Sequence, residues 1–282
     1  MLITGESSTS SPFIIYLFTA FYVLSLYNAI GVFLLVFITF KTYRGSYFWS
    51  LIVASCGLIV STIGTAVNFY TESLDKYPLV MCGVGGWVLF VTGHSLVLWS
   101  RLHLVVQSKK VLKGVLIMII TDAIIFQTPT VVFSFVGSLP NNPPALNRLY
   151  NTWEFIQVSA FCTQEFIISG IYIRETLRLL KFTFSKEKKK IIYQLLAINV
   201  IVILMDVIIL GVQYSHMRPL QIALKGLVYS MKLTLEFAIL GRLVDFARGT
   251  NQIESADTGE SHGTICKCAS GYRASCDEPS GS

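Results

Sequence analysis

The hydrophobic residues of this chain gather in long continuous runs that short polar connections separate. A run of about 20 apolar residues is the length at which an α-helix crosses a bilayer, and the runs lack the alternation of a half-buried strand. Because a bilayer interior offers the backbone no water, only helices and closed barrels cross it. The runs predict transmembrane helices over residues 13–40, 48–70, 79–103, 112–136, 150–174, 191–214 and 220–243.

Composition supports an all-α, polytopic membrane protein with a seven-helix bundle. Hydrophobic residues make up 53% of the chain and charged residues only 13%, whereas a soluble domain carries about 25% charged residues. The lipid bilayer is therefore the expected environment, and the protein is expected to cross it several times. The sequence does not distinguish the endoplasmic reticulum from the plasma membrane.

Lysine and arginine are concentrated in alternate connections of the predicted bundle. Fifteen lie in one set of connections and three in the other. By the positive-inside rule the richer set faces the cytosol, which predicts an outer or lumenal N-terminus and a cytosolic C-terminus. The same pattern accounts for the net charge of +6, so we expect no nucleic-acid partner. The fifteen are Lys41, Arg44, Arg101, Lys109, Lys110, Lys113, Arg174, Arg178, Lys181, Lys186, Lys188, Lys189, Lys190, Arg242 and Arg248, and the three are Lys76, Arg148 and Arg218.

The predicted organisation is a short outer N-terminus over residues 1–12, a membrane domain over 13–245 and a cytosolic tail over 246–282. The tail is rich in Ser, Gly, Asp and Glu, which is typical of a disordered segment. Within the membrane domain the longest predicted connection is 175–190, which contains a run of lysines.

Ionisable and amide side chains inside the predicted spans form stripes on the last three helices. At 100° per residue each set falls on one helix side, and polar groups inside a membrane usually face the bundle interior. The stripes comprise Glu154, Gln157 and Glu165 in span five, Asn199, Asp206 and Gln213 in span six, and Lys225, Tyr229, Lys232 and Glu236 in span seven. We expect them to enclose a polar cavity, although such residues also serve as interhelical hydrogen-bonding groups.

Two lysines cannot neutralise all the carboxyls of these spans. Counting Asp122 in span four, five carboxyls face two lysines, and an unpaired carboxyl in a low-dielectric interior favours its protonated form. A buried protonated carboxyl is a potential general acid. The pairs that depth allows are Lys225 with Asp206 or Glu154, and Lys232 with Glu236 or Glu165.

Three further features of the spans have structural interpretations. Arg101 stands at the inner end of span three, as in rhodopsin-like receptors, but Ser100 replaces the acid expected before it, so a snorkelling anchor is an equal interpretation. We expect His94 to pack or to form a hydrogen bond between helices. Small residues that allow close helix packing are Gly57, Ser61 and Gly64 in span two, and Gly83, Gly85, Gly86 and Gly93 in span three.

Three segments, Trp99–Val105, Trp153–Ile173 and Lys225–Leu243, resemble a family of uncharacterised fungal integral membrane proteins. The likeness covers most of residues 13–245 and implies a fungal source and seven helices. In size, short loops and buried acids the chain is also similar in organisation to fungal membrane-bound terpene cyclases of meroterpenoid pathways. This second similarity concerns architecture and not sequence motifs.

These observations lead to the hypothesis of an enzyme, a terpene cyclase for a lipophilic prenylated or epoxidised substrate. Cyclisation needs a buried acid, aromatic faces that stabilise a cation, and a dry cavity. The candidate acids are Glu154 and Asp206, with Glu165 third. The expected cavity-lining residues are Asp122, Gln157, Phe161, Lys225, Tyr229, Lys232, Glu236, Trp153 and Trp87. No cofactor or metal is expected, because no zinc-ligand spacing or phosphate-binding loop occurs, and other pathway enzymes in the same membrane are conceivable partners.

The alternative is a seven-helix receptor that couples to a cytosolic partner through its basic inner loops. A light-driven rhodopsin would need a lysine in span seven to bind retinal. Lys232 lies at a suitable depth, but one lysine alone does not identify a rhodopsin. A transporter is the weakest alternative, because the spans show no inverted repeat.

Overall fold

The computed structural model describes residues 12–40, 45–70, 76–106, 108–137, 144–182, 186–214, 221–239 and 241. The chain divides into two units, Met1–Leu240 and Gly241–Ser282, and all the helices described below belong to the first. The predicted tail over 246–282, and the predicted N-terminal segment apart from Pro12, lie outside the described residues and stay predictions.

The described elements are helices, and six segments are long and apolar enough to cross a membrane. Each of these six corresponds to one of the first six predicted spans, so the protein is a multi-pass membrane protein. Residues 221–239, the final helix, match the seventh prediction. The labelled elements are α1 (Pro12–Thr39), α2 (Ser46–Tyr70), α3 (Lys76–Val105), α4 (Lys109–Asp122), the π-helix η1 (Ala123–Gln127), α5 (Thr128–Gly137), α6 (Pro144–Phe182) and α7 (Lys186–Tyr214).

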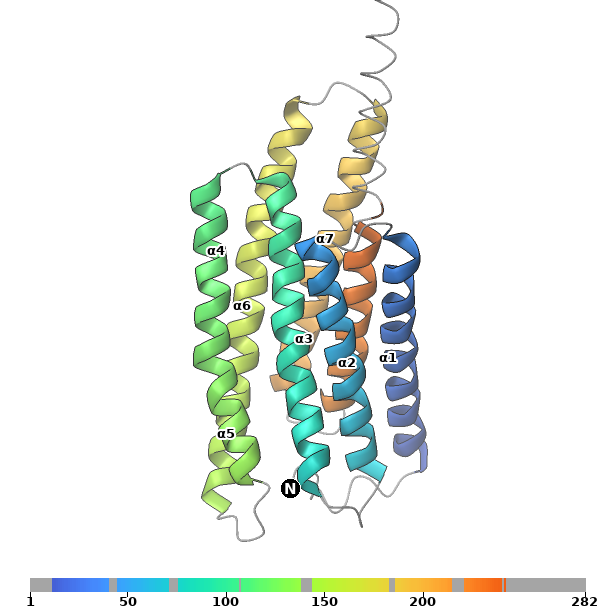
Figure 1. Ribbon diagram of the computed structural model, residues 1–282, viewed down its shortest axis with the longest axis vertical. Coiled ribbons are helices and arrows are strands. Elements are labelled where there is room, and N and C mark those ends of the chain that lie inside the picture. The colour runs from blue at the N-terminus through green and yellow to red at the C-terminus, as the bar shows by residue number, and fades with distance from the viewer. Residues whose placement is uncertain are drawn as a thin grey trace, which may run out of the picture. The chain divides into compact units, whose positions relative to one another are not determined.

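Successive spans run in opposite directions, so the bundle has two distinct ends (Figure 1). We call the end where α3 finishes and α4 begins the basic end, because Lys109, Lys113, Arg174 and Arg178 are exposed there. The other is the opposite end, where α2 finishes and α3 begins. Helix α3 is central to the packing, since it contacts α2, α4, α5 and α6.

Helices α2 and α3 form the most closely packed pair, because glycines remove side chains from their interface. A Cβ atom added to Gly86 would lie 2.8 Å from the Gly57 carbonyl oxygen, and one added to Gly93 would lie 2.6 Å from the Ala54 nitrogen. The predicted close packing is thereby confirmed for these positions. It is wrong for Gly85, where an added Cβ would meet nothing within 4 Å, because this residue faces away from α2.

The fourth span, Lys109–Gly137, contains a π-helical turn at Ala123–Gln127. Pro129 follows two residues later and has no N–H to donate to the Ile125 carbonyl. The proline ring would also clash with that carbonyl in a regular α-helix. Widening of the preceding turn relieves this conflict and directs the Gln127 side chain into the bundle, where it is buried.

The predicted connection over residues 175–190 is wrong, because most of it is helical. Helix α6 continues to Phe182 and α7 begins at Lys186. The loss of hydrophobicity marks where the chain leaves the membrane, but arginine, lysine, leucine and glutamate favour helix in water as well. With 39 residues, α6 is about 58 Å long, whereas the hydrocarbon core of a bilayer is about 30 Å thick. The α6–α7 hairpin therefore extends beyond the other helices at the basic end (Figure 1).

Substituting Gly86 by alanine should separate α2 from α3 and lower the free energy of unfolding by about 1–3 kcal/mol, the usual cost of overpacking. Its neighbour provides the control: Gly85→Ala meets no atom within 4 Å and should be neutral or stabilising, because alanine favours helix over glycine. The thermal midpoint of each purified variant in detergent measures the difference. Equal effects of the two substitutions would contradict the packing described here.

Candidate functional site

The final helix presents one polar stripe to the bundle interior. Gln221, Lys225, Tyr229, Lys232 and Glu236 follow one another at intervals of three or four residues, which places them on one side of the helix. All five are buried. The stripe spans about 22 Å along the helix axis, so polar groups line most of the depth of the bundle. Its partners on α3, α6 and α7 divide into three sets, described in turn from the opposite end.

A cavity of about 180 Å³ lies toward the opposite end of the bundle. Its wall is mostly apolar, with aromatic rings and a few polar side chains, and it is built by α1, α2, α3, α5, α6 and the final helix. The lining residues are Tyr22, Leu58, Ser61, Thr62, Gly64, Thr65, Asn68, Leu79, Val80, Gly83, Val84, Trp87, Thr130, Tyr150, Glu154, Gln157, Val158, Ile222, Lys225 and Gly226.

An ion pair between Glu154 and Lys225 forms part of the cavity wall. The Lys225 Nζ lies 2.7 Å from Glu154 Oε1, and the Gln221 amide donates to the same oxygen over 3.2 Å. Gln221 also donates to Gln213 Oε1 of α7. We call Glu154, Lys225, Gln213 and Gln221 the cavity pair and its amides. They join α6, α7 and the final helix at one level of the bundle.

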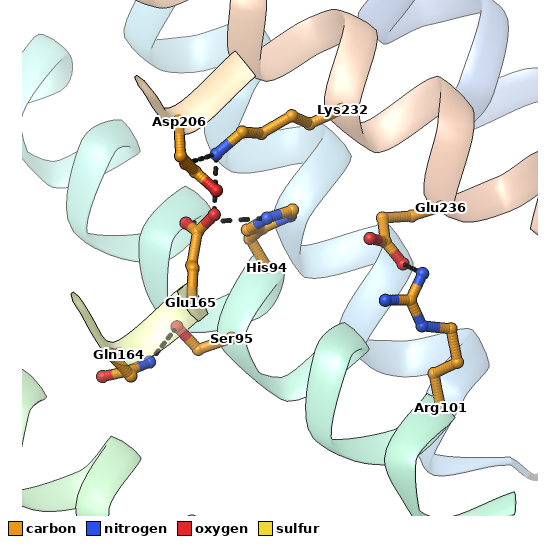
Figure 2. A network of polar contacts seen from close by, with 8 residues as sticks. All are labelled: His94, Ser95, Arg101, Gln164, Glu165, Asp206, Lys232 and Glu236. Carbon is orange, nitrogen blue, oxygen red and sulfur yellow. Dashed lines mark hydrogen bonds and ion pairs between the residues drawn. The ribbon is translucent and has the colours of Figure 1, made fainter. Parts of the chain in front are cut away.

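The second set, the central cluster, consists of His94, Glu165, Asp206 and Lys232 (Figure 2). The Lys232 ammonium donates to both carboxyls: to Glu165 Oε2 over 2.6 Å and to Asp206 Oδ1. His94 Nε2 lies 3.8 Å from Glu165 Oε1. Lys232 and Asp206 have no exposed surface at all, so this cluster is sealed inside the protein.

The third set, the Arg101 pair, lies nearer the basic end. Arg101 Nη1 is 2.5 Å from Glu236 Oε2, and Arg101 Nη2 donates to Asn199 Oδ1 over 2.9 Å. The guanidinium also lies over the Tyr172 ring, 4.7 Å from its centroid. The prediction of a snorkelling Arg101 is wrong, because its side chain is 2% exposed and its charge is compensated inside the bundle.

Aromatic rings separate the cavity from the central cluster. The Tyr229 ring contacts Trp87 and Phe90, with centroids 5.3 and 5.2 Å away. Its other neighbour is Lys232, whose Nζ lies 4.9 Å from the Tyr229 centroid. Trp87 also lines the cavity, so a ligand in the cavity would touch the ring layer that covers the central cluster.

The structure distributes the other predicted cavity residues over several environments. Gln157 lines the cavity and accepts a hydrogen bond from Thr130 over 2.8 Å. Trp153 donates to the same Thr130 hydroxyl but lies outside the lining set. Phe161 is buried in the hydrophobic core. Asp122 is only partly buried, at the end of α4, and belongs to none of the three sets.

The predicted ion pairs were right in part. Of the alternatives for Lys225 the structure selects Glu154, and of those for Lys232 it selects Glu165. Asp206 also bonds to Lys232, so it lies at the central level and not with Lys225. The i,i+4 neighbour Glu236 is taken by Arg101 instead.

Two members of the polar sets, Gln221 and Arg101, are not among the predicted site residues. Gln221 lies four residues before Lys225 and could have been found by extending that stripe one turn. Arg101 could have been found from the unmatched Glu236 carboxyl, which needed a cation. With Arg101 included, the polar sets contain three cations, one more than the two lysines counted from the sequence.

Comparisons with known proteins identify a family but no function. The family model described as a domain of unknown function (DUF7703) matches residues 4–253, and the chain belongs to that family. No curated protein and no solved structure matches the chain. Within the described residues, no group of three or more His, Cys, Asp or Glu side chains is arranged to hold a metal ion.

Removing one partner of the Arg101 pair should cost about 3–5 kcal/mol of stability, because it leaves a buried charge without compensation. We expect this for Arg101→Met and for Glu236→Gln alone. The double variant should be more stable than the sum of the two losses predicts, which a double-mutant cycle of thermal or denaturant unfolding measures. Additive losses would contradict a direct interaction between the two groups.

Proposed function

For this member of the DUF7703 family we propose a receptor-like function, in which a small molecule binds the cavity and a cytosolic partner binds the basic end. One observation carries the proposal: the polar stripe of the final helix runs from Lys225 in the cavity wall to Glu236 of the Arg101 pair, near the basic end. The positive-inside rule supports a cytosolic basic end, and hence an outer or lumenal N-terminus and a cytosolic C-terminus.

The chemistry of the cavity favours a small, largely apolar ligand with one polar group. Aromatic rings from Tyr22, Trp87 and Tyr150 line it, and the cavity pair supplies both a donor and an acceptor. Its volume of about 180 Å³ is below the roughly 300–1,000 Å³ of sites for drug-sized ligands. A ligand of modest size that competes for Lys225 or Glu154 would disturb the ion pair directly.

The α6–α7 hairpin supports a partner surface at the basic end. Arg174, Arg178 and Lys181 are exposed on α6, and Lys189 and Lys190 are exposed on α7. Clustered positive charge beyond the bilayer favours a partner with an acidic surface. Helix α6 also carries Glu154 and α7 carries Gln213, both at the level of the cavity. The same two helices therefore connect the cavity to the basic end.

Coupling between the two ends requires two states that the ligand and the partner prefer differently. The final helix is the element that both would bias, since it contributes Lys225 to the cavity pair and Glu236 to the Arg101 pair. A ligand that displaces Lys225 would change the position of this helix, and the Arg101 pair would respond through Glu236. The buried ion pairs give the bundle discrete arrangements, because a partly separated buried pair is costly.

Filling the cavity should abolish ligand binding while leaving the fold intact. Val84→Phe adds a ring to the cavity wall, and Leu89→Phe adds the same ring to α3 at a lipid-facing position that is 51% exposed. Small lipophilic alcohols, acids and amides are screened for a rise in thermal midpoint, where saturation at 100 times Kd adds about 2.7 kcal/mol. Compounds should stabilise wild type and Leu89→Phe but not Val84→Phe, and the same compounds should activate a G-protein reporter in cells. Equal stabilisation of both variants would place binding elsewhere.

Terpene cyclisation is the second candidate, favoured by the presence of the Glu154 carboxyl among aromatic rings in an apolar cavity. The fungal source, the meroterpenoid substrate and the neighbouring pathway enzymes implied by the resemblance belong to this proposal. It ranks second because an acid initiator must be protonated and must face the substrate. Glu154 is instead held by Lys225, while Asp206 and Glu165 bond Lys232 outside the cavity wall.

Expression with candidate prenylated epoxides tests the cyclase directly. If Glu154 initiates the reaction, a cyclised product should form with wild type and disappear with Glu154→Gln, and Asp206→Asn tests the second candidate acid in the same way. Mass spectrometry of the extracted products gives the readout. Absence of product with every epoxide, together with a reporter response to a small ligand, would reject the cyclase and retain the receptor.

A further inference from the structure

The polar stripe and its partners form three sets at three levels of the bundle, and the charges balance in two of them. Glu154 is matched by Lys225, and Glu236 is matched by Arg101. At the central level a single lysine, Lys232, faces two carboxyls, Glu165 and Asp206. Among the described residues this leaves one more carboxyl than permanent cations at the most enclosed level of the bundle.

An excess negative charge at this depth is energetically unfavourable. Asp206 and Lys232 are fully buried and Glu165 is 6% exposed, so water does not stabilise the second carboxylate. An uncompensated buried ion costs several kcal/mol even after relaxation, and in practice such a group gains or loses a proton. Binding of one proton makes the central cluster neutral.

The geometry indicates which groups hold that proton. The Glu165 and Asp206 carboxyls bond the same Lys232 ammonium, Glu165 through Oε2 over 2.6 Å and Asp206 through Oδ1. Two carboxyls that share one buried site repel each other when both are ionised, so one of them keeps its proton. The shared ammonium therefore favours one protonated and one ionised carboxyl in this pair.

His94 is the competing proton acceptor, and its surroundings argue against it. Neither ring nitrogen has a hydrogen-bond partner, and Nε2 is 3.8 Å from the nearest Glu165 oxygen. The ring stacks on Phe90 with centroids 5.7 Å apart. An imidazolium has two N–H donors to satisfy, and this site satisfies neither, so the neutral ring fits better.

The other titratable groups found around the cluster among the described residues lie on α3, α6 and the final helix. They are neutral side chains or members of the Arg101 pair, so none supplies a second free cation. The groups are Arg101 of α3, Cys162 of α6, and Tyr229 and Glu236 of the final helix.

We propose that the central cluster is a proton-binding site, in which the Glu165–Asp206 carboxyl pair holds one exchangeable proton against the Lys232 ammonium. The site gives the middle of the bundle two charge states, between the cavity and the Arg101 pair. The inference does not depend on the nature of the cavity ligand, and it can fail or succeed independently of the receptor and cyclase proposals.

Infrared spectroscopy of the full chain in lipid nanodiscs tests the site without any ligand. Every sample carries Asp122→Asn, which removes the partly buried carboxyl outside the three sets. The parent should show the carbonyl band of a protonated carboxylic acid, and this band should shift in D₂O. Asp206→Asn and Glu165→Gln should each abolish it, because the remaining carboxylate then pairs with Lys232 alone. Glu236→Gln, the matched control at a balanced level, should leave the band unchanged.

Thermal unfolding of the same samples gives a second readout, in which similar substitutions have different effects. Asp206→Asn should leave the midpoint close to that of the parent, because charge balance is kept, whereas Glu236→Gln should lower it by several degrees. The double Asp206→Asn, Glu165→Gln variant should also fall, because Lys232 loses its counter-ion. The proposal is overturned if the parent lacks the band, if the band survives both single substitutions, or if His94→Gln alone removes it. Absence of the band from the parent overturns the proposal even if a variant does not fold.

Discussion

The requirement that each charge buried within the membrane have a counter-charge governs the interior of this protein. Arg101, Lys225 and Lys232 would each be prohibitively costly alone in a low-dielectric bundle, and each is compensated by a carboxylate from another element. These pairs connect α3 and α6 to the final helix, and Asp206 adds α7. A helix that supplies three ionisable groups can therefore lie inside the bundle only when its neighbours are in register.

Two different kinds of packing divide the bundle. On one side, α2 and α3 approach through glycines, which bring the backbones close together. On the other, α6, α7 and the final helix are held by side chains that are long and charged. The cavity lies where the two regions meet, with small residues of α2 and α3 on one wall and Glu154 and Lys225 on the other. The apolar majority of this wall, with one ion pair in it, is the basis for proposing a small-molecule ligand.

The receptor and cyclase hypotheses use the same cavity but require different states of the Glu154 carboxyl in its wall. A cyclase needs a proton on the acid that faces the substrate, whereas a receptor needs only that occupancy disturb an interaction. The salt bridge between Glu154 and Lys225 suits the second requirement better than the first. The protonated carboxyl that the charge balance calls for lies one level deeper, behind the Trp87–Tyr229 ring contact, where a cavity ligand would not reach it directly.

The amino-acid sequence is enough to predict an all-helical, multi-pass membrane protein, because the length of an apolar run and the absence of water in a bilayer leave few alternatives. It also located the interior side of α7, since Asn199, Asp206 and Gln213 recur every seven residues and all are buried. Periodicity along one helix says nothing about which helix lies opposite or at what height. The tertiary structure alone decided that Glu236 meets Arg101 and not Lys232, that Asp206 shares Lys232 with Glu165, and that Gly85 faces away from α2. The structure also extends α6 to Phe182 and begins α7 at Lys186, within the predicted 175–190 connection, because hydrophobicity marks the membrane boundary and not the end of a helix.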